Sequence, residues 1–435
     1  MNQYAQMIRL LKTPAVMKQL THLYGQRDGM LVSQTARYTR LLKRHEELIG
    51  TENGLMLVSA PGRTEIVGNH TDHNRGKVLA AAVNLDSVAA VSKRDDGIVR
   101  VLSDGYDPME ITLDDLAARK EEEGTTAALI RGVAKRLQEL GFVIGGFDAV
   151  VNSTVRGGSG LSSSASFEVM TCAVFDALYN GWTIDAKKRA TVSQYAENVY
   201  FGKPSGLMDQ MASSQGGLTC IDFKDDDPKI KSVPYDFAQK GYALVVVNTG
   251  GSHDDLTPEY AAIPTEMRAV AAVFGEKSLR RVRPEQFYQN IGTLREKLDP
   301  ATGDRAILRA AHYFEENARV ADMADALQRD DLDAFRRGMV ASGRSSFMYL
   351  QNVSTGNKHE ELALALMLAE QLLGDRGAWR VHGGGFAGTT LNLVPQGELD
   401  GFVKHMESVF GAHSCNVLDI RPDGAAYIDL CALNA

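Results

Sequence analysis

Residues 157–166, GGSGLSSSAS, combine the residue types that bind phosphate. Glycines let a backbone approach an anion closely, and the following run at 167–179 has the apolar spacing of a helix, whose start offers free N–H groups and a positive dipole end. The three serines at 162–164 add hydroxyls for phosphate oxygens or a magnesium ion. A helix cap alone needs only one serine. No GxxxxGK[ST] is present, so the pattern predicts a phosphate loop of a non-Walker type.

A second polar segment, GRTEIVGNHTDHNRG at 62–76, gathers short polar side chains beside glycines. Its candidate residues are Arg63, Glu65, Asn69, His70, Asp72 and His73. A sugar site needs many such groups on a loop held by a rigid sheet, and an arginine could neutralise charge on a transferring phosphoryl group. Two alternatives stay open, a metal site built from the two histidines and the aspartate, or a solvated charged loop.

Two carboxylates flank the GKP turn at 202–204. Glu197 lies late in one predicted helix and Asp209 early in the next. Such a pair can face one cleft, where one carboxylate holds magnesium and the other addresses a hydroxyl. The alternative is that both are solvated acids on helix surfaces.

The glycine cluster at 383–388 contains a formal GxGxxG match. A dinucleotide-binding fingerprint requires a helix after the glycines, whereas TTLNLV at 389–394 has the pattern of a strand. We therefore interpret this cluster as a tight turn between strands, or as a loop that supports the nucleotide.

Composition narrows the class of protein. The chain has 435 residues, 44% of them apolar, and a net charge of −8 without a basic run, which argues against a nucleic-acid partner. Four scattered cysteines fit a reducing compartment. The most apolar stretch, 78–91, is too short for a bilayer, and no secretion signal is apparent. We expect no membrane partner and a cytoplasmic location.

Strands and helices are mixed in both halves of the chain, without the arrangement of a doubly wound parallel sheet, which predicts an α+β fold. Helical spacing predicts a helical extension over residues 1–50. The expected strands are 55–59, 78–92, 98–102, 145–155, 242–250 and a strand–turn–strand over 379–395. The expected helices are 125–140, 167–179, 186–201, one from about residue 205, and then 258–274, 305–340 and 358–373.

In this order, three motifs resemble the galactokinase family of the GHMP small-molecule kinases: PGRTEIVGNHTDHNRG (61–76), GGSGLSSSAS, and HGGGFAGTTLNLV (382–394). AENVYFGKPSGLMDQ at 196–210 is similar to the family segment with the catalytic aspartate. The resemblance runs from about residue 57 to the C-terminus. It implies two domains, 51–240 of the ribosomal protein S5 domain 2-like type and 241–435 of ferredoxin-like α+β type, with the active site in the cleft between them.

The resemblance also implies a reaction and roles for residues. ATP and Mg²⁺ would be used to phosphorylate the anomeric C1 hydroxyl of galactose or a related sugar. Asp209 would accept the proton of that hydroxyl, Arg63 would stabilise developing charge beside it, and Asp72 would bind the C3 and C4 hydroxyls. The sugar pocket would also contain Asn69, His70, Gly206 and Tyr260. The ATP loop would comprise Gly157, Gly158, Ser159, Gly160, Leu161, Ser162, Ser163 and Ser164, with Ser164 and Glu197 holding magnesium.

The chain departs from the family pattern at several positions. Asn69 stands where the family has a glutamate that contacts the C6 hydroxyl, which makes substrate choice at C6 less defined. His73 replaces the common tyrosine, Ser205 the common cysteine, and TGGSHDDL at 249–256 differs as well. Two alternatives follow, a kinase for another sugar with an axial C4 hydroxyl (N-acetylgalactosamine or arabinose) and a catalytically inactive galactose sensor. The oligomeric state is left open, and a monomer is compatible with the sequence.

Overall fold

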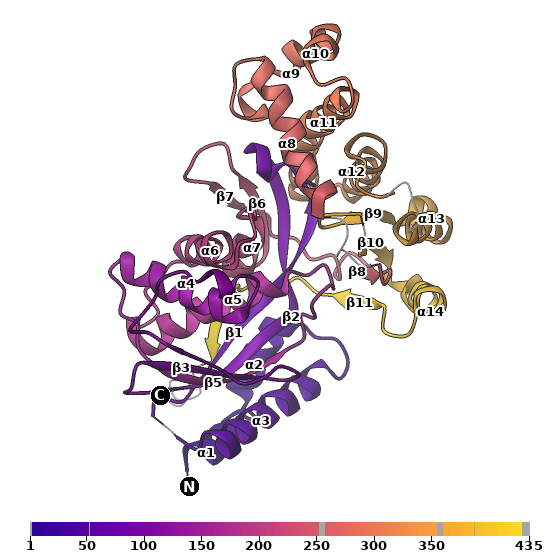
Figure 1. The fold of residues 1–435 in the computed structure, drawn as a ribbon. Coiled ribbons are helices and arrows are strands. Elements are labelled where there is room, and N and C mark those ends of the chain that lie inside the picture. Colours follow the sequence, from indigo (N-terminus) through magenta and orange to yellow (C-terminus); the bar gives the residue numbers. More distant parts are fainter. Residues whose placement is uncertain (1, 52, 252–256, 355–359, 387, 429–435) are drawn as a thin grey trace.

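The first of two β-sheets contains both long strands of the molecule. The computed structural model describes residues 2–51, 53–251, 257–354, 360–386 and 388–428. Six of the eight strands follow the order β12-β1-β2-β5-β3-β4, while β6 pairs with β2 and β7 pairs with β6 (Figure 1). The strands of this sheet are β1 (Met56–Val67), β2 (Lys77–Lys93), β3 (Ile98–Ser103), β4 (Met109–Thr112), β5 (Phe147–Ser153), β6 (Leu218–Asp222), β7 (Lys229–Ser232) and β12 (Ala426–Ile428). The beginning of β2 pairs with β6 and its end pairs with β5, so this strand joins both parts of the sheet.

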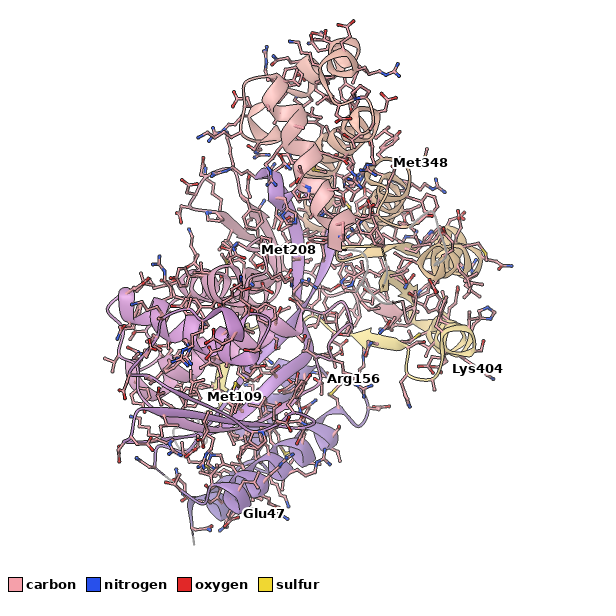
Figure 2. The ribbon with its side chains drawn as sticks, in the orientation of Figure 1. Glu47, Met109, Arg156, Met208, Met348 and Lys404 are labelled. Atoms are coloured by element: carbon pink, nitrogen blue, oxygen red, sulfur yellow. The ribbon has the colours of Figure 1, made fainter. Side chains whose placement is uncertain are left out.

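Strand alternation divides the first sheet between two hydrophobic cores. On β1, Val58 packs with the helices of one face, whereas its neighbour Leu57 packs on the other face. Side chains of a strand point alternately to opposite faces, so an uninterrupted apolar run predicts a sheet covered on both sides. The first face is covered by α4 (Thr126–Glu139), α5 (Ser163–Phe175) and α6 (Ala186–Tyr195), while α7 (Met208–Gln215) packs on β2 around Met208 (Figure 2).

The helical extension covers the second face. Its helices are α1 (Gln3–Leu10), α2 (Pro14–Tyr24) and α3 (Met30–Leu48), as the sequence predicted. A fully buried carboxylate, Asp86 on β2, connects α2 and α3 to the sheet. It accepts hydrogen bonds from Arg37 Nη1 at 2.6 Å, Tyr24 Oη at 2.5 Å, Ser59 Oγ at 2.5 Å and Arg421 Nη1 at 2.9 Å. Burial alone would raise the pKa of Asp86, but the two guanidinium groups hold it below its ordinary value.

The second sheet has the ferredoxin-like strand order expected of residues 241–435. Its strands are β8 (Tyr242–Asn248), β9 (Ala378–His382), β10 (Thr389–Pro395) and β11 (Cys415–Leu418), ordered β11-β8-β10-β9 and all antiparallel. Between β8 and β9 the chain forms a helical layer (Figure 1). Its helices are α8 (Thr257–Val273), α9 (Pro284–Gln289), α10 (Ile291–Lys297), α11 (Gly303–Gln328), α12 (Leu332–Ser345) and α13 (Glu361–Leu373), and α14 (Leu399–Phe410) follows β10.

The two sheets share a core. Ile66 and Leu79, near one end of the β1–β2 pair, pack with Val246 and Leu391 of the second sheet and with α11 and α12. After β11 the chain returns to the first sheet, where β12 pairs with β1. The division of the chain at 240/241 stays a prediction, although the return of β12 makes one strand after that boundary part of the first sheet.

The elements differ from the sequence expectations where local signals were weak. The helix expected from residue 205 begins at Met208, and the single helix expected over 305–340 is two helices separated at Asp330, whose φ is +58°. The segment 61–67, expected as a turn-rich loop, continues strand β1. None of the described helices has both the length and the apolar character that crossing a bilayer requires.

Candidate functional site

Arg63 and Asp209 form the centre of the candidate site. Arg63 is on β1 and Asp209 is in the first turn of α7. The guanidinium binds the carboxylate through two bonds, from Nε to Oδ1 and from Nη2 to Oδ2, each 2.7 Å long. This two-pronged geometry fixes both groups in one orientation. The two residues that the sequence predicted to act on one sugar oxygen are therefore in direct contact, although 146 positions separate them.

The predicted phosphate loop contacts the same pair. Ser162, which precedes α5 and has a φ of +58°, makes no capping bond with its side chain and instead donates a hydrogen bond to Asp209 Oδ2 at 2.7 Å. Arg63 Nη1 donates to the Gly160 carbonyl at 2.5 Å, and the Arg63 backbone N–H donates to the Leu161 carbonyl at 3.1 Å. At Gly160 φ is +73°, and a Cβ atom would lie 2.3 Å from Thr389 Oγ1, so the loop can pass here only with a glycine.

The remaining loop residues differ in their surroundings. Gly157 and Gly158 face open space, Ser159 donates to the Arg156 carbonyl at 2.6 Å, and the Leu161 side chain is part of the core shared by the sheets. Leu161 thus contributes its backbone, not its side chain, to the candidate site.

The two predicted magnesium ligands also lie together. Ser164 Oγ, in the first turn of α5, donates to Glu197 Oε1 at 2.9 Å, and Gln210 Nε2 holds the other carboxylate oxygen at 2.7 Å. Lys203 Nζ lies 3.0 Å from Glu197 Oε1. Glu197 is on the short π-helical segment η4 (Ala196–Phe201) that continues α6. A hydroxyl and a carboxylate are oxygen donors of the kind Mg²⁺ takes together with nucleotide phosphates, so this donor set fits the ion.

The predicted sugar residues meet one another in two contacts, Asp72 with Gly206 and His70 with Tyr260. Asp72, which starts η1 (Asp72–Asn74), abuts Gly206, where a Cβ atom would lie 1.9 Å from Asp72 Oδ2. The His70 ring lies 5.0 Å from the Tyr260 ring and stacks on His73 at 5.6 Å. The alternative of a metal site on these histidines has no support, since no group of three metal-ligating side chains is found among the described residues.

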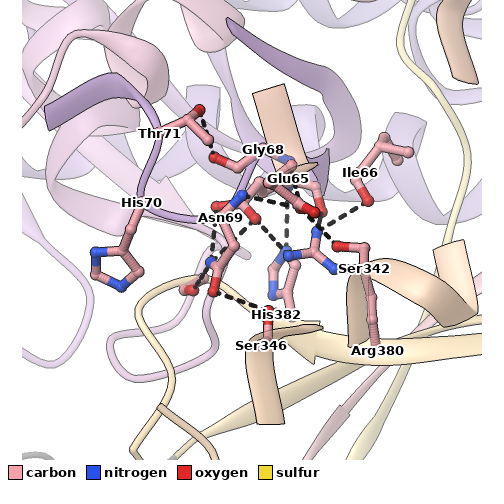
Figure 3. A network of polar contacts seen from close by, with 12 residues as sticks. Glu65, Ile66, Gly68, Asn69, His70, Thr71, Ser342, Ser346, Arg380 and His382 are labelled. Carbon is pink, nitrogen blue, oxygen red and sulfur yellow. Dashed lines mark hydrogen bonds and ion pairs between the residues drawn. The ribbon is translucent and has the colours of Figure 1, made fainter. Parts of the chain in front are cut away.

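The Asn69 side chain points into the protein (Figure 3). Its amide nitrogen donates to Glu65 Oε1 at 3.1 Å and to the Gly383 carbonyl at 2.6 Å, and its oxygen accepts from Asn352 Nδ2 at 2.7 Å. Glu65 in turn binds Arg380 Nη2 at 2.7 Å. Asn69 is 1% exposed, so it is a core residue of this conformation.

The glycine cluster after β9 contacts the polar segment 62–76 through its backbone. The Gly384 carbonyl is 2.9 Å from His70 Nε2, and the Gly383 carbonyl accepts from Asn69. His382 connects the same turn to the Thr64 hydroxyl at 3.0 Å. Sequence reasoning offered a simple turn or support of the nucleotide, and it missed the supporting residues Asn352, Glu316, His312, Arg380 and His382. Their partners lie more than 200 residues away along the chain, so no local pattern indicates them.

The charge state of Asp209 follows from its surroundings. Burial would raise the pKa of its carboxyl, but the Arg63 guanidinium and the Ser162 hydroxyl outweigh burial and hold the pKa below its ordinary value. Asp209 is therefore ionised at neutral pH and is a weak base.

Buried histidines make the stability depend on pH, and burial lowers the pKa of four of them, His45, His70, His312 and His382. Burial lowers the pKa of His70 to about 3 and that of His45, on α3, to about 4. Below pH 6.5 the unfolded chain binds protons that the folded chain does not, so stability is complete above that pH and falls as pH decreases from 6.5 to about 4, by up to about 1.4 kcal/mol per pH unit for each histidine. Melting temperatures between pH 7 and pH 4.5 test this prediction. His45→Gln should reduce the dependence, whereas the exposed His405→Gln should leave it unchanged.

A cavity of about 830 Å³ lies elsewhere, lined in part by Arg336, Arg344 and Trp379. None of the predicted site residues lines it, and its arginines have acidic neighbours such as Asp333 and Glu370.

Known protein families match this chain in the regions that contain the segments 62–76 and 157–166. A family model described as the galactokinase galactose-binding signature matches residues 43–93, and the N-terminal domain model of GHMP kinases matches residues 128–217. A galactokinase of Streptomyces coelicolor is 34% identical over 380 residues, which cover 85% of this chain and 92% of that protein. The chain belongs to the galactokinase family. The resemblance of the ordered motifs is thereby confirmed.

Solved structures confirm the GHMP kinase fold of this family member. The galactokinase of Lactococcus lactis, solved with galactose, superposes with a TM-score of 0.78 at 23% identity and covers 90% of this chain and 99% of its own. Mevalonate kinase of Methanococcus jannaschii superposes with a TM-score of 0.59 at 14% identity, over 86% of this chain and 99% of its own. This galactokinase family member is a sugar kinase that uses ATP.

Proposed function

We propose that the enzyme transfers the γ-phosphoryl group of ATP to the anomeric C1 hydroxyl of galactose, giving galactose 1-phosphate and ADP. The observation that carries the proposal is the two-pronged Arg63–Asp209 pair, to which Ser162 of the glycine–serine loop is also bonded. Arg63, which is proposed to act beside the sugar oxygen, and Ser162, which is proposed to bind phosphate, therefore contact the same carboxylate, that of Asp209. Membership of the galactokinase family identifies the sugar.

The low pKa of Asp209 indicates how it acts. A weakly basic carboxylate orients the C1 hydroxyl by accepting its hydrogen bond, and takes the proton late, when the oxygen–phosphorus bond has formed. Arg63 balances negative charge that develops on the phosphoryl oxygens. His70, neutral at working pH because burial lowers its pKa to about 3, contributes only neutral hydrogen bonds and ring contact with Tyr260 to the pocket.

Ser164 and Glu197 are proposed to hold Mg²⁺, which would neutralise phosphate charge when bound. We expect Glu197→Gln to raise the Mg²⁺ concentration for half-maximal activity at least about tenfold, because the variant keeps the Ser164 contact but loses the charge. A Mg²⁺ titration at saturating ATP and galactose measures this. Glu121→Gln, at an exposed position, is the control, and an unchanged Mg²⁺ requirement in Glu197→Gln would contradict the assignment.

An ADP-release assay with galactose, N-acetylgalactosamine, arabinose and glucose tests the proposed reaction. We expect the highest kcat/KM with galactose and little turnover of glucose, whose C4 hydroxyl has the opposite configuration. No turnover of galactose at millimolar concentration would overturn the proposal. Turnover of another axial-C4 sugar in its place would assign the first alternative, and galactose binding without any turnover would assign the sensor. The cytoplasmic location stays a prediction, and the oligomeric state stays open.

A further inference from the structure

Asn69 lies in the polar segment 62–76, directly before His70, yet its side chain is hydrogen-bonded to other groups of the protein. A neutral amide has two N–H donors and one accepting oxygen. One donor is directed at Glu65 (3.1 Å) and the other at the Gly383 carbonyl (2.6 Å), and the oxygen accepts from Asn352 (2.7 Å). Figure 3 shows His70 pointing away from this network and Asn69 pointing into it.

Glu65 determines which kind of residue can stand at position 69. Glu65 is 3% exposed, and a buried ionised carboxylate requires a partner of opposite charge. Arg380 is that partner, with Nη2 at 2.7 Å from Glu65 Oε1. The side of the carboxylate that faces residue 69 can only accept hydrogen bonds, so residue 69 must donate. A second carboxylate there would put two negative charges about 3 Å apart without water. A carboxylate at 65 therefore favours a hydrogen-bond donor at 69 and disfavours a carboxylate there.

We propose that Glu65 is a positioning residue for sugar specificity, because it holds the Asn69 amide inside the protein and so removes residue 69 from recognition of the sugar. The inference rests on the proposed function and on the family resemblance that puts residue 69 next to C6. An enzyme rejects an analogue that lacks a hydroxyl when the analogue leaves a buried protein group unpaired. Here the Asn69 pairs stay intact whether or not the sugar has a C6 hydroxyl, so discrimination at C6 is weak.

The first test compares kcat/KM for D-galactose and for 6-deoxy-D-galactose with the wild-type enzyme. We expect the two values to agree within about tenfold, whereas a site built to bind the missing hydroxyl discriminates by about 10⁴-fold. A kcat/KM for galactose that exceeds the value for 6-deoxygalactose by about 10³-fold or more would overturn the inference. Absence of activity with galactose itself would instead refute the proposed function.

The second test exchanges the two residues. Asn69→Glu alone should lower the melting temperature, because it places two buried carboxylates side by side. The double variant E65N/N69E should recover at least half of that loss and raise the preference for galactose over 6-deoxygalactose at least tenfold, since the glutamate at 69 has a second oxygen besides the one that Asn352 occupies. Melting temperatures are measured without sugar, so this part is independent of catalysis.

Asn392→Asp is the matched control. Asn392 is a buried amide on β10 that donates to the Val245 carbonyl at 3.2 Å. Combined with Glu65→Asn, it should change the melting temperature additively. Additive behaviour of E65N/N69E as well would overturn the coupling, and an unchanged sugar preference in that double variant would overturn the role in specificity.

Discussion

Asp209→Asn is expected to lower kcat by about 10³-fold while ATP binding persists. The amide keeps the shape of the carboxylate but cannot accept the proton of the C1 hydroxyl, and loss of such a group costs about 10²–10⁴-fold. Ser162 and Arg63 lose a charged partner in the variant, so a lower melting temperature is expected as well. Steady-state kinetics with galactose and calorimetric titration with ATP measure the two properties separately.

The control for this prediction is Asp225→Asn, which changes an exposed carboxylate on the turn after β6 and should leave kcat unchanged. If Asp209→Asn keeps kcat within about threefold of the wild-type value, a change far smaller than the expected loss, Asp209 does not act on the hydroxyl. If the variant loses ATP binding together with kcat, its effect is on the phosphate loop.

The largest effect on stability is expected for Asp86→Asn. The substitution keeps the volume of the side chain and leaves Arg37 and Arg421, both almost fully buried, without their counter-charge. Breaking a buried ion pair on one side costs about 3–5 kcal/mol. We therefore expect the first sheet and its helical extension to unfold at a much lower urea concentration, while the second sheet is affected less.

The two tryptophans allow this unfolding to be followed by region. Trp182 packs against Tyr427 beside the first sheet, and Trp379 lies on β9 of the second. In a Trp379→Phe background, the remaining fluorescence reports the first sheet. Asp304→Ala, which removes an exposed partner of Arg295, is the control and should cost less than about 1 kcal/mol. An equal cost for both substitutions would contradict the role of Asp86.

The sequence predicted most of the candidate site because each motif is local. The contact of Ser162 with Asp209 and that of Ser164 with Glu197 join residues that the sequence had already assigned to one site. Arg63 was placed in a loop but lies on strand β1, because its polar neighbours concealed a strand whose core-facing residues include Ile66.

What the sequence could not predict depends on partners far along the chain. Asn69 was expected in the sugar pocket, and only the contacts with Gly383 and Asn352, 314 and 283 positions away, show that its side chain is buried in the protein. The same holds for Asp86, which lies within the apolar stretch 78–91 and is the centre of an ionic cluster with Arg37 and Arg421. Short β-strands such as β12 have no periodicity long enough to detect.

The return of the chain to its first sheet has a consequence for biosynthesis. Strand β12 and Arg421 are translated more than 300 residues after β1 and Asp86, with which they pair. A nascent chain that has exposed only its first half at the ribosome has a sheet with an open edge beside β1 and a buried acid with half of its cationic partners. Complete folding of the amino-terminal half must therefore wait until synthesis has passed the second sheet, and a chaperone has that interval in which to protect the exposed edge.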